Sequence, residues 1–363
     1  MKDVILRNVR AEQYICAAKK NFIMRNAPDC LSESTSKLVI GHITDLHGDY
    51  ERFENAMSVF EHLKPDFVVH TGDLVKWNMD DDYSFFYDRI QKSPIPVYNC
   101  VGNHDTFKKS GNLSASEMDT ELVKPLRNII NSDGEGYYYV DFPEKEIRLI
   151  VLNDYQGGND KCAILQSQCE WMIEVLIDSV EKNLGVILAS HENKEDVSGG
   201  ANDKGFCQRY SVYPWGTPMP KPLVIADIID AFRNGKSLCK QYTWWYGSGA
   251  EVEINCQFDK KGDFICYLCG HRHGDFIGYL PSYPDQLSVT MTCSGCFPPD
   301  YHNIGEEASD LPRIPQTASE DAINFYVIDR KKKTLTAVRY GACVNDLFEE
   351  RLVAEYEYNK DRN

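Results

Sequence analysis

The sequence predicts a layered α/β domain, and three observations support this prediction. Short apolar runs rich in valine, isoleucine and tyrosine recur along the chain, and each ends in a polar or glycine-containing segment. Segments with apolar residues at helical spacing lie between several of these runs. The chain has 363 residues, which is ample for a sizeable core. Because alternating strands and helices are typical of α/β folds, we expect layers of sheet and helix.

The apolar runs are interpreted as buried strands, because they are short, rich in β-branched residues and bounded by turn-forming residues. They cover residues 37–43, 66–70, 96–101, 147–152, 185–189 and 264–268. Helices are expected at about 51–63 and 168–182, where apolar side chains recur at helical spacing. Near the end of the chain, 322–329 and 334–340 flank a short basic run, a pattern that predicts a β-hairpin.

Composition excludes several classes of protein. Hydrophobic residues make up 42% and aromatic residues 12%, which excludes a disordered or fibrous chain. The net charge of −16 argues against a protein held on nucleic acid or an anionic membrane by bulk charge. Charged residues break every apolar stretch near the N-terminus, and no run of about 18 apolar residues occurs, so we expect neither a signal peptide nor a membrane span. The expected location is cytoplasmic.

The 13 cysteines are scattered, which favours free thiols in a reducing compartment. Two Cys-x-x-Cys pairs, Cys266/Cys269 and Cys293/Cys296, raise the alternative of a zinc ribbon. However, Cys266 and Cys269 fall in a predicted strand, where side chains three positions apart face opposite sides. Buried thiols are therefore the preferred interpretation.

Five short motifs rich in histidine, aspartate and asparagine come just after predicted strands. They are Asp45-Leu-His47, Gly72-Asp73, Gly102-Asn103-His104-Asp105, Ser190-His191 and Gly270-His271-Arg272-His273. Ligands of open α/β sheets bind beyond the carboxyl ends of strands, so these segments could meet in one crevice. In an extended segment, residues two positions apart face the same side, which would align the ends of Asp-x-His and His-x-His. Imidazole and carboxylate together favour first-row metals over calcium.

The order of these motifs resembles the calcineurin-like metallophosphoesterase superfamily over about residues 37–275. The resemblance implies a four-layer α/β/β/α sandwich of two mixed sheets flanked by helices. We expect a single domain over residues 1–363, with its core at about 37–191 and 263–345. Residues 192–262 do not fit the strand–helix alternation and hold three of the five tryptophans. That segment is expected to form a cap-like insertion, although its aromatic residues could equally pack its own core.

The resemblance also implies two divalent metal ions, drawn from Mn, Fe, Zn, Co or Ni. One metal would be held by Asp45, His47, Asp73 and His273. The other would be held by Asp73, Asn103, His191 and His271, so that Asp73 bridges the pair.

The same resemblance implies a mechanism, in which a hydroxide that bridges the metals attacks phosphorus in line. His104 would contact the phosphate or protonate the leaving oxygen, and Asp105 would orient His104 by accepting its other N–H. A general acid of this kind typically contributes about 10²–10⁴-fold to the rate. The expected substrate is a small or medium phosphate monoester or diester.

The motifs depart from those of several subfamilies of the superfamily. Serine/threonine phosphoprotein phosphatases carry Asp-Arg-Gly soon after Gly-Asp, whereas residues 72–78 of this chain read Gly-Asp-Leu-Val-Lys-Trp-Asn, which disfavours that subfamily. Purple acid phosphatases place a metal-binding tyrosine at the position of Lys76, so they are disfavoured as well. A nuclease remains open, but the charge of −16 offers no visible track for a long nucleic acid. A catalytically inactive interaction module on the same fold would be marked by lost ligands, and none is missing from these motifs.

Overall fold

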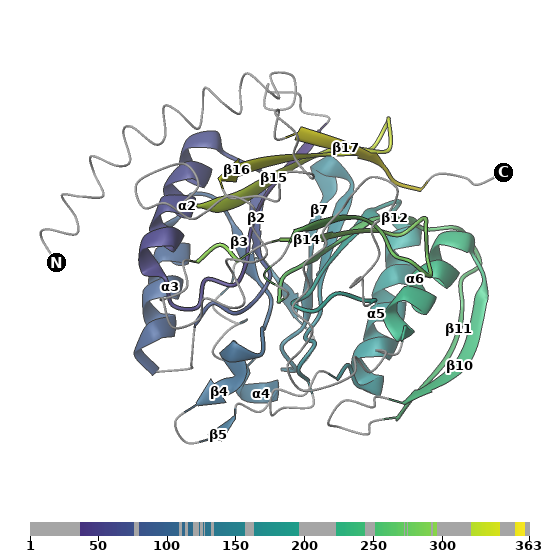
Figure 1. Ribbon diagram of the computed structural model, residues 1–363. Coiled ribbons are helices and arrows are strands. Elements are labelled where there is room, and N and C mark those ends of the chain that lie inside the picture. Colours follow the sequence, from purple (N-terminus) through teal and green to yellow (C-terminus); the bar gives the residue numbers. More distant parts are fainter. Residues whose placement is uncertain are drawn as a thin grey trace, which may run out of the picture.

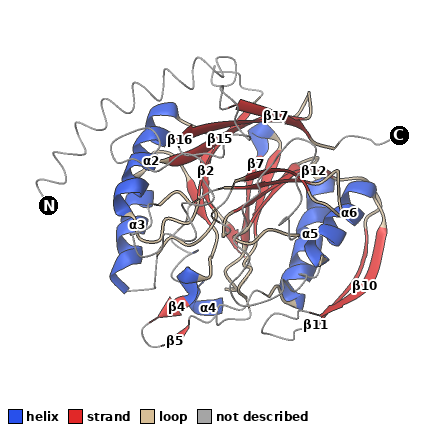
Figure 2. Cartoon of the chain, viewed as in Figure 1, coloured by secondary structure: helices blue, strands red, loops and turns tan. Residues whose placement is uncertain are grey.

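The fold is a sandwich of two sheets between two layers of helices, as the computed structural model shows in Figure 1. The structure describes residues 37–75, 80–108, 111–112, 115–118, 123, 126, 128–131, 134–156, 163–195, 223–243, 251–271, 273, 275–291, 293–295, 321–341 and 353–359. In Figure 2 the strands of the two large sheets lie between helices on both sides. The predicted four-layer architecture is therefore confirmed.

The first sheet has the strand order β17-β16-β15-β1-β2-β3. Its parallel half consists of β1 (Leu38–Ile43), β2 (Phe67–His70) and β3 (Val97–Asn99). Its antiparallel half consists of β15 (Ala322–Asp329), β16 (Thr334–Gly341) and β17 (Val353–Glu357). The predicted C-terminal hairpin is β15–β16, and it extends the sheet from the edge of β1.

The second sheet has the order β13-β14-β12-β9-β8-β7-β6. Its parallel strands are β8 (Ile147–Val151), β9 (Gly185–Ala189), β12 (Asp263–Cys269) and β14 (Leu287–Thr290). Antiparallel strands flank them at both edges, namely β6 (Ile130–Asn131), β7 (Tyr138–Phe142) and β13 (Phe276–Tyr279). All six strands predicted from apolar runs are present in one sheet or the other.

Helices cover the outer faces of both sheets (Figure 1). On the first sheet they are α2 (Tyr50–Leu63) and α3 (Asp80–Lys92), and on the second α5 (Gln166–Glu181) and α6 (Val224–Asn234). The remaining short elements are η1 (His104–Thr106), β4 (Phe107–Lys108), β5 (Gly111–Asn112), α4 (Ala115–Met118) and η3 (Pro143–Lys145). The two predicted helices correspond to α2 and α5.

Local sequence explains where α2 begins and ends. The side chain of Asp49 accepts a hydrogen bond from the backbone N–H of Arg52 at 3.0 Å, which satisfies one free donor of the first turn. Lys64 then leaves the helix in the left-handed conformation. On its apolar face, Phe60 packs edge-on against Phe325 of β15, with ring centroids 5.5 Å apart. The helix is thereby fixed to the outer face of the first sheet.

The two sheets are joined by a continuous apolar core. Phe67 of β2 stacks on Phe142 of β7 with ring centroids 4.4 Å apart. Nearby, the buried hydroxyl of Tyr138 in β7 donates a hydrogen bond to the carbonyl oxygen of Asn99 in β3 at 3.0 Å. Each large apolar side chain buried here contributes about 1.5–3 kcal/mol, so this interface fixes how the sheets face one another.

The described part of segment 192–262 forms α6 and a hairpin of β10 (Ser237–Thr243) and β11 (Glu251–Gln257). Apolar side chains of both elements join an outer core with α5 and the second sheet. This part therefore belongs to the outer layer beside α5. Trp215, Trp244 and Trp245 lie outside the described residues, and a cap over the site stays a prediction.

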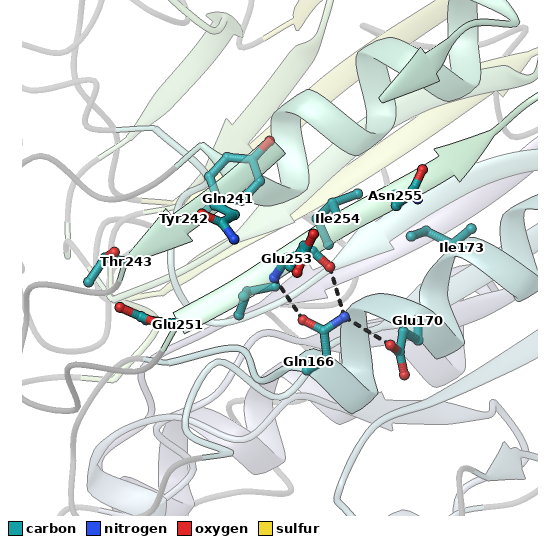
Figure 3. Close-up of a pocket in the computed structure, with 11 residues that line it drawn as sticks. Gln166, Glu170, Ile173, Gln241, Tyr242, Thr243, Glu251, Glu253, Ile254 and Asn255 are labelled. Atoms are coloured by element: carbon teal, nitrogen blue, oxygen red, sulfur yellow. Dashed lines mark hydrogen bonds between the residues drawn. The ribbon is translucent and has the colours of Figure 1, made fainter. Parts of the chain in front are cut away.

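Figure 3 shows a pocket between α5 and this hairpin. Gln166 bonds to both backbone groups of Glu253, accepting from its N–H at 2.9 Å and donating to its C=O at 2.8 Å. The amide of Gln166 also donates to Glu170 at 2.9 Å. These bonds hold the β11 edge against α5, and none of the predicted metal-site residues lines the pocket.

The interpretation of Cys266 and Cys269 as buried thiols agrees with the structure. Cys266 lies in the core between the sheets, whereas Cys269 lies in the outer core under α5 and α6. Their side chains therefore face opposite sides of β12 and do not form one metal site. Cys296 lies outside the described residues. Among the described helices, none is both long and apolar enough to cross a membrane.

A buried polar network runs beneath the carboxyl ends of the strands. Arg339 of β16 pairs with Asp275, and its Nε donates to Asn324 Oδ1 at 2.5 Å. Asn324 donates to the hydroxyl of Tyr326 at 2.6 Å, and that hydroxyl lies 2.9 Å from Nδ1 of His42. The side chains of Arg339 and Asp275 are 0% and 1% exposed, so water stabilises neither charge and each is stabilised by the opposite charge of the pair.

Replacement of Arg339 by methionine should destabilise the fold by about 3–5 kcal/mol, because it leaves the carboxylate of Asp275 buried without its cation. Chemical denaturation measures this loss. Lys92→Met is the matched control: Lys92 and Asp88 are 76% and 73% exposed, and their pair should contribute less than about 1 kcal/mol. Equal losses in the two variants would contradict the importance of the buried pair.

Candidate metal centre

The residues predicted to bind metal converge at one end of the sandwich. They follow the carboxyl ends of five parallel strands, β1, β2 and β3 in the first sheet and β9 and β12 in the second. Within the described residues, the predicted ligands form two overlapping groups, and each draws side chains from both sheets. The site therefore lies across the seam between the sheets.

The first group contains Asp45, His47, Asp73 and His273, whose ligand atoms all lie within 4.8 Å of one another. Nε2 of His273 is 3.1 Å from Oδ1 of Asp45 and 3.1 Å from Nε2 of His47. Oδ2 of Asp73 lies 3.9 Å from Nε2 of His47. This is the set expected to hold one metal.

The second group contains Asp73, His191 and His271. Oδ2 of Asp73 lies 3.3 Å from Nε2 of His191, so the same oxygen borders both groups. Oδ1 of Asn103 joins this group, at 3.2 Å from Nε2 of His191 and 3.1 Å from Nδ1 of His271. All seven predicted ligands are thus brought together.

The donor atoms of the first group fit a divalent cation. Oδ2 of Asp45 accepts hydrogen bonds from the Thr44 hydroxyl at 2.6 Å and from the backbone N–H of His271 at 3.0 Å. Oδ1 of Asp45 is buried and accepts no hydrogen bond from the described residues. An unsatisfied buried acceptor costs about 1–3 kcal/mol or more when charged, and a coordinated cation would remove that cost. Imidazole nitrogen with carboxylate oxygen suits first-row transition metals.

The protonation states of His47 and His191 also favour a bound cation. Burial lowers the pKa of His47 to about 3, which leaves its ring neutral with a lone pair available. Burial also opposes a charge on His191, but the adjacent carboxylate of Asp73 outweighs it and raises the pKa of His191 to about 10. A proton on His191 thus compensates the buried charge of Asp73. A metal cation would serve the same electrostatic purpose.

Five of the seven predicted ligands have left-handed backbone conformations. The φ angles are 50° at Asp45, 48° at His47, 56° at Asp73, 67° at His271 and 53° at His273. This conformation costs about 1–2 kcal/mol for a residue with a side chain, and such outliers cluster at functional sites. The expectation of extended Asp-x-His and His-x-His segments was wrong: the side chains converge because the backbone turns sharply at each ligand.

Two motif glycines have a steric explanation. Gly72 has φ of 95°, and a Cβ there would approach Nδ1 of His191 to 2.5 Å. A Cβ on Gly270 would overlap Thr44 and lie 2.7 Å from Oδ2 of Asp45. Glycine at these positions lets the backbone lie directly against the ligands.

His104 lies at the rim of the site. Its backbone N–H donates to Oδ1 of Asp73 at 2.8 Å, which leaves Oδ2 of Asp73 facing the two groups. Its ring is half-buried and packs edge-on against the ring of His47, with centroids 4.7 Å apart. The side chain is therefore beside the first group, and its part in the reaction stays a prediction.

Asp105 is buried behind the ligands and holds the backbone around Asp73. Its carboxylate accepts N–H groups from Asp73 at 2.9 Å, Leu74 at 2.9 Å, Val75 at 3.3 Å and Gly102 at 2.8 Å. Burial, together with the charge of Asp73, raises the pKa of Asp105 to about 7. These bonds tie the second motif to the third, a task that the sequence did not suggest. The contact expected between Asp105 and the His104 ring stays a prediction.

Two further residues lie beside the predicted ligands: Glu192, which no motif indicated, and Cys293, which was expected only as a buried thiol or part of a zinc ribbon. Oε1 of Glu192 lies 3.3 Å from Nε2 of His271. The thiol of Cys293 donates to the carbonyl oxygen of Asp45 at 2.7 Å and lies near His47 and His273. Glu192 is adjacent in sequence to His191, and Cys293 follows β14, so their positions just past strands were the available signal.

Comparison with known proteins agrees with this geometry. The calcineurin-like phosphoesterase family matches residues 38–275 of the chain. The chain belongs to this family, which confirms the resemblance drawn from the motifs and supports the predicted class of hydrolases acting on phosphoester bonds.

Among individual relatives, a probable cyclic nucleotide phosphodiesterase of Moraxella catarrhalis is 26% identical over 180 residues, covering 47% of this chain and 62% of the relative. A second probable cyclic nucleotide phosphodiesterase, of Fibrobacter succinogenes, is 28% identical over 158 residues, covering 40% and 56%. The chain thus matches about three-fifths of the length of these relatives. A dimetal phosphatase from Danio rerio shares the fold, with a TM-score of 0.55 at 11% identity over 89% of this chain and 99% of that one.

Substitutions in the two groups should show whether each group binds its own metal ion. Asp73→Asn should lower metal content to near zero, since its Oδ2 borders both groups, whereas His273→Ala should remove only the metal of the first group. Elemental analysis after gel filtration measures both. His62→Ala, which changes an exposed histidine of α2, should leave the content unaltered. Undiminished metal content in Asp73→Asn would refute the shared carboxylate.

Proposed function

We propose that the protein is a two-metal phosphoesterase that hydrolyses a small phosphate ester, with a diester as the preferred class. The observation that carries this proposal is the position of Asp73, whose Oδ2 lies between two groups of buried ligands. A carboxylate in such a position can serve two cations at once. Both groups contain the imidazole and carboxylate donors that suit Mn, Fe, Zn, Co or Ni.

Each side chain then has a definite task. Asp45, His47 and His273 would hold one ion, Asn103, His191 and His271 the other, and Asp73 both. When bound, such a pair supplies Lewis-acid stabilisation of the phosphoryl oxygens and lowers the pKa of a nearby water toward neutrality. Asp105 would keep Asp73 in place through its backbone contacts.

His104 would act on the leaving group. Its ring is half-buried at the rim and packs against His47, so it borders the space where an ester would meet the first group. A hydrogen bond or proton from this ring would stabilise the departing alkoxide.

The substrate class rests on two supporting observations. The relatives from Moraxella and Fibrobacter are named probable cyclic nucleotide phosphodiesterases, which favours a small phosphodiester. The net charge of −16 disfavours a long polyanion, because the surface beyond the metals would repel it. A nuclease activity is therefore expected to be absent or weak.

The function is tested by hydrolysis of p-nitrophenyl phosphate, its bis ester and a 3′,5′-cyclic nucleotide after removal of metals with EDTA and addition of each metal singly. Turnover should vanish on removal and return with at least one of the five metals. The absence of turnover with every one of these metals would refute the proposal and favour an inactive interaction module. Cleavage of long DNA in preference to the small esters would favour the nuclease.

His104→Ala should lower kcat by about 10²–10⁴-fold for a diester with an alkoxide leaving group. The loss should be much smaller for a p-nitrophenyl ester, whose leaving group departs as the stable p-nitrophenolate anion and needs no proton. Steady-state kinetics on the two ester types measures this difference, with metal content as the control. Equal losses on both esters, or loss of metal, would show that His104 is not the acid.

A further inference from the structure

The two ring nitrogens of His271 face different neighbours. Nδ1 lies 3.1 Å from Oδ1 of Asn103 and 3.1 Å from Nε2 of His191, so it points into the second group. Nε2 lies 3.3 Å from Oε1 of Glu192, on the other side of the ring. A neutral imidazole carries one proton, and a proton on Nε2 leaves the lone pair of Nδ1 toward the ligands.

Glu192 is fixed in this position from several directions. The hydroxyl of Tyr155 donates to its Oε1 at 2.8 Å. Its backbone N–H donates to Oδ2 of Asp154 at 2.6 Å, and its carbonyl oxygen accepts from the Ser190 hydroxyl at 3.0 Å. The side chain is only 7% exposed. The carboxylate is therefore held against His271 rather than turned toward solvent.

The lysine nearest in sequence to Glu192 is already paired with another carboxylate, which leaves Glu192 beside His271. Lys194 is buried and pairs with Asp154 at 2.5 Å, so the neighbouring carboxylate already has its own cation. Tyr155, Glu192 and His271 follow β8, β9 and β12, which are adjacent parallel strands of the second sheet. The fold thus places a tyrosine, a carboxylate and a predicted ligand in a row along one sheet edge.

We propose that Glu192, held by Tyr155, is a positioning residue that selects the tautomer of His271 and strengthens its Nδ1 as a donor to the second metal. The inference rests on the proposed function, because it needs the second group to bind a metal. A carboxylate behind a ligating histidine fixes ring orientation and raises basicity, and its loss typically costs about 10–100-fold in metal affinity.

The experiment measures two metal dissociation constants by chelator competition, using Glu192→Gln and Tyr155→Phe in the full chain. Glu192→Gln keeps the volume but removes the charge, so the second constant should weaken about 10–100-fold while the first stays unchanged. Tyr155→Phe should weaken the second constant in the same direction by less. Glu146→Gln, an exposed carboxylate paired with Arg330, is the matched control and should change neither.

The tautomer gives an independent readout. In the metal-free protein, nitrogen-15 NMR should show His271 protonated at Nε2 in the wild type, with a larger share of the Nδ1-protonated form in Glu192→Gln. Two unchanged dissociation constants together with an unchanged tautomer would overturn the role of Glu192. A wild-type chain that binds two metals yet hydrolyses no ester would instead overturn the proposed function. The role of Glu192 would then still be decided by the two dissociation constants.

Discussion

The shared carboxylate of Asp73 is the constraint on which the rest of the site depends. One oxygen accepts the backbone N–H of His104, and the other borders both ligand groups. That placement requires a left-handed residue at Asp73, since the chain must turn immediately after β2. The bonds from Asp105 to the surrounding backbone hold this turn. A buried aspartate, its strained backbone and a second buried aspartate therefore form one unit.

The convergence of the seven candidate ligands could be predicted because each follows a strand that is recognisable as an apolar run, and the carboxyl ends of parallel strands meet at one edge. The sequence could not predict the left-handed turns, since the left-handed conformation of Asp45 or His273 depends on contacts with distant segments. The motifs also did not indicate the contacts of Glu192 with His271 and Tyr155 or the backbone contacts of Asp105. Residue types and their order along the chain are visible in the motifs, whereas contacts between distant segments appear only in the fold.

The C-terminal hairpin supports the site although it lies beyond the matched family region, which ends at residue 275. Arg339 of β16 pairs with Asp275, two residues after His273. From Arg339 the hydrogen bonds continue through Asn324 and Tyr326 to His42, whose Nε2 lies 2.9 Å from the Thr71 hydroxyl. The carbonyl oxygen of Thr71 in turn lies 2.6 Å from Nδ1 of His191. The hairpin is thereby connected to two predicted ligands that follow strands of the second sheet, His191 and His273.

Because each ligand group takes side chains from both sheets, a cation held there is also a cross-link between the two halves of the sandwich. Its binding free energy adds to the stability of the packed sheets, by about 2.7 kcal/mol when the free metal is at one hundred times its dissociation constant. The core around Phe67 and Phe142 and the metal centre then resist the same motion, separation of the sheets. Metal supply would then govern the stability of the packed sheets as well as the state of the candidate site.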